Sequence, residues 1–188
     1  MKKFYALSVV SLFFAALGYG QSTRTWNGGS TGDWNTGSNW SGNAVPGSSD
    51  SVVFTSSAEV NLDVANIDIK SLTITSGATV KLIGVVDDWT TMTVLNADYP
   101  ALRIDAGSRL VDSVYGEAFA FDFVLAPGAG AEISGAWVFA GSDESLGSAL
   151  LAVDLGPGVI NVNNGGSIIL GSNGYSPLTD GANAAFFI

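Results

Sequence analysis

The chain of 188 residues contains no cysteine and no histidine. Without cysteine, the fold has no disulfide bonds. Without histidine, most zinc sites, Ser-His-Asp triads and histidine general bases are excluded. Proline is scarce at 5 residues, whereas glycine is abundant at 24. Apolar residues alternate with polar ones between Gly, Ser and Asn positions, a pattern that predicts many short strands joined by turns in one domain.

Basic residues are also few, and two of them lie at the start of an expected targeting segment. Lys2 and Lys3 precede an apolar run, Phe4–Leu17, which small residues follow. This order predicts a cleavable secretion signal over residues 1–20, with an uncleaved N-terminal anchor as the alternative. The chain then becomes polar, and we expect no transmembrane helix after the signal. The predicted location is therefore extracellular or on the outer cell surface.

The expected mature chain is strongly acidic. Loss of Lys2 and Lys3 leaves 5 basic and 17 acidic residues, a net charge of −12. Nucleic acids and anionic membrane surfaces need a basic partner surface, so both are disfavoured. The charge favours solubility. Weak Ca²⁺ binding is the alternative, although the chain has neither an EF-hand loop nor a calcium-binding nonapeptide repeat. We expect no other cofactor.

An eleven-residue pattern recurs along the chain. In Leu72–Leu82, two short alternating segments flank a turn at Gly77. Copies of this pattern occur at Val52–Leu62 around Ser57, Leu102–Leu110 around Gly107, Phe123–Ile133 around Gly128 and Gly130 (a distorted copy), and Ile160–Leu170 around Gly165. Repeated units that cannot bury an apolar face alone indicate a stacked architecture.

Within the repeats, apolar residues alternate with polar ones, as Val60 and Leu62 do around Asn61. A period of two puts one face in a core and the other in water. We therefore predict an all-β fold, a single right-handed parallel β-helix over residues 52–188. An antiparallel β-sandwich is the alternative. The apolar final residues 186–188 suggest that the stack continues in further repeats or on another chain.

A glycine-rich aromatic block, residues 21–51, precedes the repeats. Trp26, Trp34 and Trp40 fit neither a helical stripe nor one strand. A stacked fold needs a cap over its exposed end, and large aromatic side chains suit that role. The alternative is a platform for carbohydrate, because tryptophan faces stack on sugar rings.

This block resembles the start of a group of secreted bacterial proteins. The shared residues include Trp26-Asn27-Gly28, Asp33-Trp34, Asn39-Trp40, Pro46 and Asp50, followed by Val52 and Phe54. Such proteins have parallel β-helix repeats of the autotransporter-associated type, and many carry a PEP-CTERM sorting tail. The resemblance implies a surface or extracellular location and brings no catalytic residues.

Residues 83–101 lengthen one interval between repeats. Insertions in solenoids form loops that often carry function. This segment offers Asp87, Asp88, Trp89, Asp98 and Tyr99. The alternative is an additional pair of strands with Asp87-Asp88 at their turn. The complete set of candidate carbohydrate contacts is Trp26, Trp34, Trp40, Trp89 and Tyr99.

These observations predict a surface-associated scaffold or adhesin-like segment without catalytic activity. The alternative is a module that binds extracellular polysaccharide. The third hypothesis is a polysaccharide-degrading enzyme. Such an enzyme would need a Lys or Arg beside two carboxylates in a groove. In the sequence, no basic residue lies beside an acidic pair. The predicted partners are therefore extracellular polysaccharide or cell-surface components.

Overall fold

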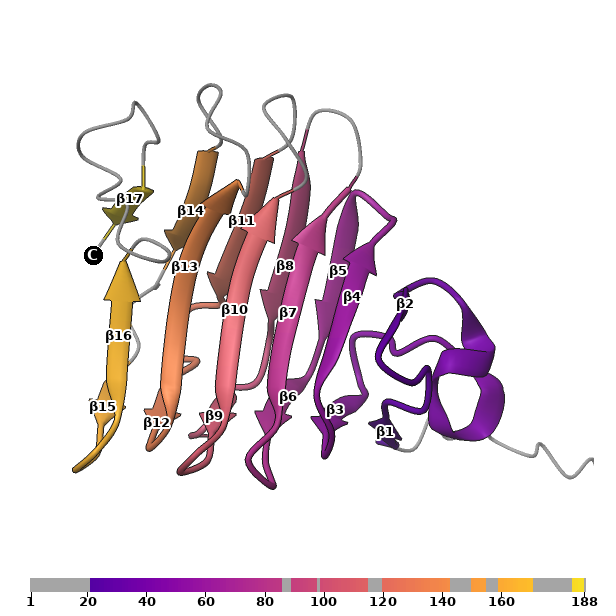
Figure 1. Ribbon diagram of the computed structural model, residues 1–188, viewed down its shortest axis with the longest axis horizontal. Coiled ribbons are helices and arrows are strands. Elements are labelled where there is room, and N and C mark those ends of the chain that lie inside the picture. The colour runs from indigo at the N-terminus through magenta and orange to yellow at the C-terminus, as the bar shows by residue number, and fades with distance from the viewer. Residues whose placement is uncertain are drawn as a thin grey trace, which may run out of the picture.

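The computed structural model describes residues 21–85, 89–97, 99–114, 120–142, 150–154, 159–170 and 184–187. They form three sheets of parallel strands (Figure 1). The first sheet contains, in spatial order, β1 (Thr23–Thr25), β3 (Ser51–Phe54), β6 (Ser71–Ile74), β9 (Leu102–Ile104), β12 (Ala131–Ile133) and β15 (Ile160–Val162). The second contains β2 (Thr31–Asp33), β4 (Ala58–Leu62), β7 (Thr79–Gly84), β10 (Arg109–Val114), β13 (Ala136–Ser142) and β16 (Ser167–Leu170). The third contains β5 (Asn66–Ile69), β8 (Thr90–Val94), β11 (Ala120–Leu125), β14 (Leu150–Asp154) and β17 (Ala184–Phe187).

The chain visits the three sheets in turn, so each coil stacks on the one before it. Figure 1 shows the chain rising through the near strands β4, β7 and β10, and returning through β5, β8 and β11 behind them. The chain advances from right to left in this view while it turns in this sense, so the coil is right-handed. All pairs of named strands are parallel. The parallel β-helix prediction is therefore confirmed, and the antiparallel sandwich is excluded.

Alternating residues of each strand point into the core and stack in columns. In the first sheet, apolar side chains occupy equivalent positions of successive coils and are completely buried. One such column contains Val52, Leu72, Leu102 and Ala131, and its neighbour contains Phe54, Ile74, Ile104 and Ile133. Adjacent strands lie about 4.8 Å apart, so each side chain packs on its counterpart. Full burial of one such side chain contributes about 1.5–3 kcal/mol, which makes these columns the main source of stability.

Glycines shape the corner between the first and second sheets. Gly77, Gly107 and Gly165 have φ of +72°, +78° and +88°, as the turn prediction for these copies requires. The corner of the first copy has Ser57 instead. Its hydroxyl accepts a hydrogen bond from the backbone N–H of Thr79 in the next coil, at 2.9 Å. This contact fastens the serine corner to its neighbour.

The distorted copy at Phe123–Ile133 spans a different corner from the other copies, and its prediction as an equivalent repeat is wrong. Its Gly128, with φ of +85°, turns the chain from the third sheet to the first. The segment equivalent to the copy at Leu102–Leu110 is Ala131–Phe139, because β12 pairs with β9 and β13 pairs with β10. Its corner passes through Gly135, where a Cβ would lie 2.2 Å from the carbonyl oxygen of Ser108. Both corners use glycine, so the local pattern did not distinguish them.

The centre of the interval at residues 83–101 is a strand. Residues 90–94 form β8, in which Met92 and Val94 are buried, and this strand lies between β5 and β11 in the third sheet. The strand alternative is therefore correct for Thr90–Val94. Residues 86–88 and 98, including Asp87, Asp88 and Asp98, lie outside the described residues, as does the predicted signal over residues 1–20.

Candidate functional site

The three tryptophans of the N-terminal block are buried at the first end of the stack. Trp26, Trp34 and Trp40 are 3%, 1% and 1% exposed. The ring of Trp40 packs edge-on against Trp26 and Trp34, with centroids 5.0 and 4.7 Å away, and contacts Phe54 of the first full coil. These rings expose no face to a sugar. Their position matches the cap interpretation and does not support the carbohydrate platform.

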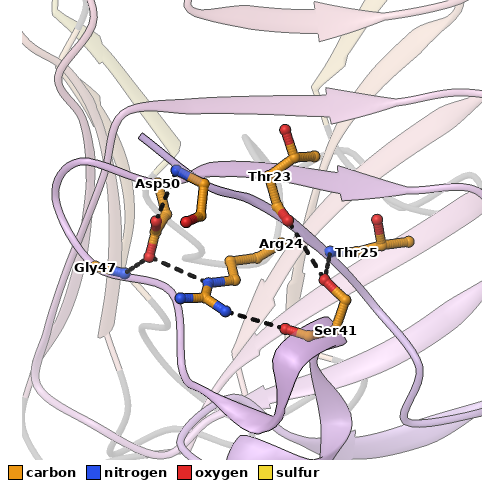
Figure 2. Close-up of polar contacts among 7 residues, drawn as sticks. Thr23, Arg24, Thr25, Ser41, Gly47 and Asp50 are labelled. Atoms are coloured by element: carbon orange, nitrogen blue, oxygen red, sulfur yellow. Dashed lines mark hydrogen bonds and ion pairs between the residues drawn. The ribbon is translucent and has the colours of Figure 1, made fainter. Parts of the chain in front are cut away.

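Two short 3-10 turns, η1 (Gly37–Asn39) and η2 (Ser41–Asn43), carry the chain across this end. A polar network joins η2 to β1 (Figure 2). Arg24 lies in register with inward-facing Val52 and pairs with the carboxylate of Asp50 at 3.4 Å, while its Nη1 donates to the carbonyl of Ser41 at 3.1 Å. Asp50 also accepts from the backbone N–H of Gly47 at 3.0 Å. The network satisfies polar groups at the end of the core, which is a structural role.

The other two candidate aromatic residues are exposed, but they lie apart. Trp89 is 38% exposed and precedes β8, whereas Tyr99 is 46% exposed and follows it. The length of β8 therefore separates the two rings, and they form no common platform. Of the five candidate carbohydrate contacts, Tyr99 alone belongs to a wider polar cluster.

That cluster occupies the outer surface of the first sheet, and we call it the ladder face. Arg103, Glu132 and Asn161 lie side by side on β9, β12 and β15. The remaining members are Thr75, Tyr99, Asp105, Ser134 and Asn163. Outward positions of successive coils coincide in a parallel β-helix, and for this reason residues 62 positions apart in sequence meet here.

Hydrogen bonds connect the ladder face from coil to coil. The hydroxyl of Thr75 donates to Asp105 at 2.7 Å, and Arg103 Nε donates to the other carboxylate oxygen, also at 2.7 Å. In the next coils, the amide of Asn163 donates to Glu132 at 3.1 Å and to the hydroxyl of Ser134 at 2.9 Å. The surface therefore presents a continuous series of planar polar groups.

Electrostatics limits the chemistry available on the ladder face. The hydrogen bond from Thr75, and after it the Arg103 guanidinium, lower the pKa of Asp105. In turn, Asp105 raises the pKa of Arg103 above its ordinary value. Arg103 also lies opposite Glu132, so the fold does bring a basic residue beside two carboxylates. A guanidinium that keeps its proton cannot act as a general base. A carboxylate whose pKa is lowered, such as that of Asp105, is a weak general base.

Tyr99 is held at the end of the ladder face by two contacts. Its hydroxyl oxygen accepts a hydrogen bond from Asn161 Nδ2 at 3.0 Å. Its ring passes over Gly130, where a Cβ would lie 2.8 Å from the ring atom Cδ2 and 2.7 Å from the carbonyl oxygen of Val159. Gly130 thus provides the space that this ring needs, while nearly half of the tyrosine remains in solvent.

A buried carboxyl group that sequence reasoning missed lies inside the solenoid. Asp112 occupies an inward position of β10, in register with Leu82 and Phe139, and is 0% exposed. Its Oδ2 accepts a hydrogen bond from the indole Nε1 of Trp137, while Oδ1 has no hydrogen-bond partner among the described residues. Burial raises the pKa of Asp112 to about 8, against the opposing effect of Trp137. The signal was present in the sequence, because an aspartate stands where the alternation requires an apolar residue.

No group of three or more His, Cys, Asp or Glu side chains that could hold a metal ion is found in the described part of the chain. Within the same residues, no helix is long and apolar enough to span a membrane. Comparisons with protein-family models, curated proteins and solved structures give no match to this chain.

The last described coil leaves apolar residues in solvent. Val159, Val162 and Ile169 are 61%, 47% and 40% exposed, although Val162 continues the inward column that contains Ile133. In the first and second sheets, β15 and β16 are the outermost strands at this end. Unpaired strand edges and exposed apolar side chains favour contact with another coil or chain.

Proposed function

We propose that this protein is a secreted, surface-associated β-solenoid that serves as a structural scaffold or adhesin-like segment without catalytic activity. The observation that carries the proposal is the way in which polar side chains connect successive coils. The pairs Thr75–Asp105, Asn163–Ser134 and Asn61–Asp33 each join one coil to another at 2.7–2.9 Å. Such contacts stiffen a stack along its axis, which is what a scaffold requires.

The proposed location depends on the N-terminal sequence and on the resemblance of residues 26–54 to secreted bacterial β-helix proteins with autotransporter-associated repeats. We include in the proposal that a further coil or another chain stacks on β15 and β16. The exposed Val159 and Val162 support this part, because contact there would remove apolar surface from water.

Location is tested with the native protein from its source cells. The intact mass and the cell fraction are measured, followed by N-terminal peptide sequencing. The expected result is a chain that begins near Gln21 in the medium or the envelope fraction. A chain that retains Met1 and remains in the cytosol contradicts the proposal.

The mechanical role is tested by single-molecule pulling of the full mature chain. Partner residues show that one coil requires 20 residues from Val52 to Leu72 and 30 from Leu72 to Leu102. Coils that detach one by one should lengthen the chain in steps of about 70 Å and about 100 Å. The matched variant N163A removes one connection between coils and should lower the force of one step. Smooth extension without steps is the contradicting result.

A further inference from the structure

We propose that the ladder face around Tyr99 binds a neutral, hydroxyl-rich polysaccharide. The inference goes beyond a scaffold function, and it does not depend on the buried tryptophans of the cap. It depends on the juxtaposition of one exposed aromatic ring with a row of planar polar side chains from three successive coils.

The aromatic part of the site is Tyr99. Sugar rings present C–H faces that pack on aromatic rings, which also supply large contact area at low entropic cost. Tyr99 is 46% exposed although its hydroxyl is bonded to Asn161 and its ring borders Gly130. An exposed aromatic side chain fixed at both its hydroxyl and its ring is preorganised for stacking, so little conformational entropy is lost on binding.

The polar part of the site is the row Arg103, Glu132 and Asn161. Neighbouring members are about 4.8 Å apart because they occupy paired positions on adjacent strands. Guanidinium, carboxylate and amide groups offer paired donors or acceptors, the arrangement that matches two neighbouring sugar hydroxyls. The Arg103 side chain is 52% exposed, and its hydrogen bond to Asp105 uses Nε, so within the described part of the chain its two Nη groups remain as donors.

Charge selects a neutral polymer over an anionic one. The expected mature chain has a net charge of −12, and Asp105 and Glu132 lie within the site itself. The single cation, Arg103, is already paired with Asp105 at 2.7 Å. A uronic acid or sulfated polymer would meet repulsion here, whereas uncharged hydroxyl groups would not.

The site also has a direction. Tyr99 leads into β9 but reaches Asn161 of β15, so its side chain crosses the one coil between them, that of β12. A polymer lying along the axis of the stack can contact the ring and the polar row together, whereas a single sugar cannot span them. We therefore expect a polysaccharide chain to bind more tightly than its monosaccharide.

The test is native gel electrophoresis of the full mature protein through gels that contain one soluble polysaccharide. The probes are hydroxyethyl cellulose, galactomannan, xylan and dextran, with polygalacturonate as the anionic comparison. We expect at least one neutral polymer to retard the protein. Y99A should weaken that binding at least about tenfold, since it removes the stacking surface. W89A removes the other aromatic ring that is exposed among the described residues, at the opposite end of β8, and should leave the retardation unchanged.

Thermal unfolding of Y99A and W89A is measured alongside, and Y99F provides a second variant that keeps the ring and loses the hydroxyl. We expect Y99F to retain most of the binding. The proposal is overturned by retardation with polygalacturonate alone, by no retardation with any neutral probe, or by equal effects of Y99A and W89A. It is also overturned if Y99A binds the neutral polymers as well as the unmodified protein does.

Discussion

The indole N–H of Trp137 donates a hydrogen bond to the carboxyl group of Asp112 across two neighbouring coils in the middle of the apolar core. The ring of Trp137 packs against Phe123 and Phe139, with centroid distances of 5.1 and 5.0 Å. The strand pairing shifts beside this contact, because Asp112 faces Phe139 whereas Ser113 faces Gly141. A β-bulge thus accompanies the one carboxyl group that is completely buried among the described residues.

The stability of the protein should depend on the protonation of Asp112. Its pKa is raised to about 8 by burial, whereas an aspartate in an unfolded chain titrates near about 3.9. The folded state therefore binds one more proton than the unfolded state between these values. The stabilisation is complete below about pH 4 and is lost as pH rises towards about 8, so the free energy of unfolding decreases over this range.

Thermal melts at several pH values check this expectation with D112N as the matched control. The melting temperature of the unmodified protein should fall by roughly 10 °C more than that of D112N between about pH 5 and about pH 9. Other titrating groups act in both proteins, so the difference isolates Asp112. Equal pH profiles would show that Asp112 does not bind the extra proton.

Removal of the indole donor should destabilise the fold at neutral pH. The variant W137F keeps most of the aromatic packing and leaves both oxygens of Asp112 without a hydrogen-bond partner among the residues that the structure describes. A cost of about 2 kcal/mol is expected from the unsatisfied polar group, with a smaller addition from lost volume. In a D112L background, W137F should cost clearly less, because no carboxyl group remains. Urea unfolding of the four proteins measures this coupling, and additive effects would refute it.

Two glycine corners should differ in their tolerance of alanine. At Gly77, a Cβ meets nothing within 4 Å, so G77A costs only the penalty for φ of +72°, about 1 kcal/mol. At Gly135, a Cβ would lie 2.2 Å from the Ser108 carbonyl oxygen and 2.4 Å from that of Asp105. These are backbone atoms of the preceding coil, so G135A must displace a coil and should cost at least about 3 kcal/mol.

The control for this pair is G47A, where no atom lies within 4 Å of the new Cβ and no positive φ is required. It should change stability by less than about 0.5 kcal/mol. Chemical denaturation ranks the three variants. An equal cost for G77A and G135A would mean that the close approach at Gly135 does not constrain the stacking of coils.

The cap should depend on Asp50 more than on Arg24. The Asp50 carboxylate accepts from Arg24 and from the backbone N–H groups of Gly47 and Ser22, at 3.0–3.4 Å (Figure 2). D50A leaves these donors without their acceptor and should cost about 2 kcal/mol, whereas R24A removes a partly exposed ion pair and should cost about 1 kcal/mol.

Urea unfolding and limited proteolysis check the two cap variants. D50A should increase cleavage within residues 22–50 before the rest of the chain is cut, because the cap opens first. If R24A is more damaging than D50A, the ion pair, and not the backbone contacts of Asp50, holds the cap in place.

The amino-acid sequence by itself determined the kind of fold and most of its corners. Alternating residues such as Val60 and Leu62 defined the buried face, since side chains of a strand point to opposite sides in turn. Gly77, Gly107 and Gly165 marked corners, because a positive φ is accessible to glycine at little cost. The cap position of Trp26, Trp34 and Trp40 also followed from the need of a stacked fold to close its end.

The tertiary structure decided which residues meet. The coil lengths, 20 residues and then about 30, fix which outward positions fall side by side, and a local pattern does not encode that register. For this reason the sequence did not predict that Arg103 lies beside Glu132, or that Tyr99 contacts Asn161, 62 positions away. It also misplaced the corner at Gly128. Stacking converts separate strands into one surface, so the ladder face and the buried Asp112 site exist only once the coils are in register.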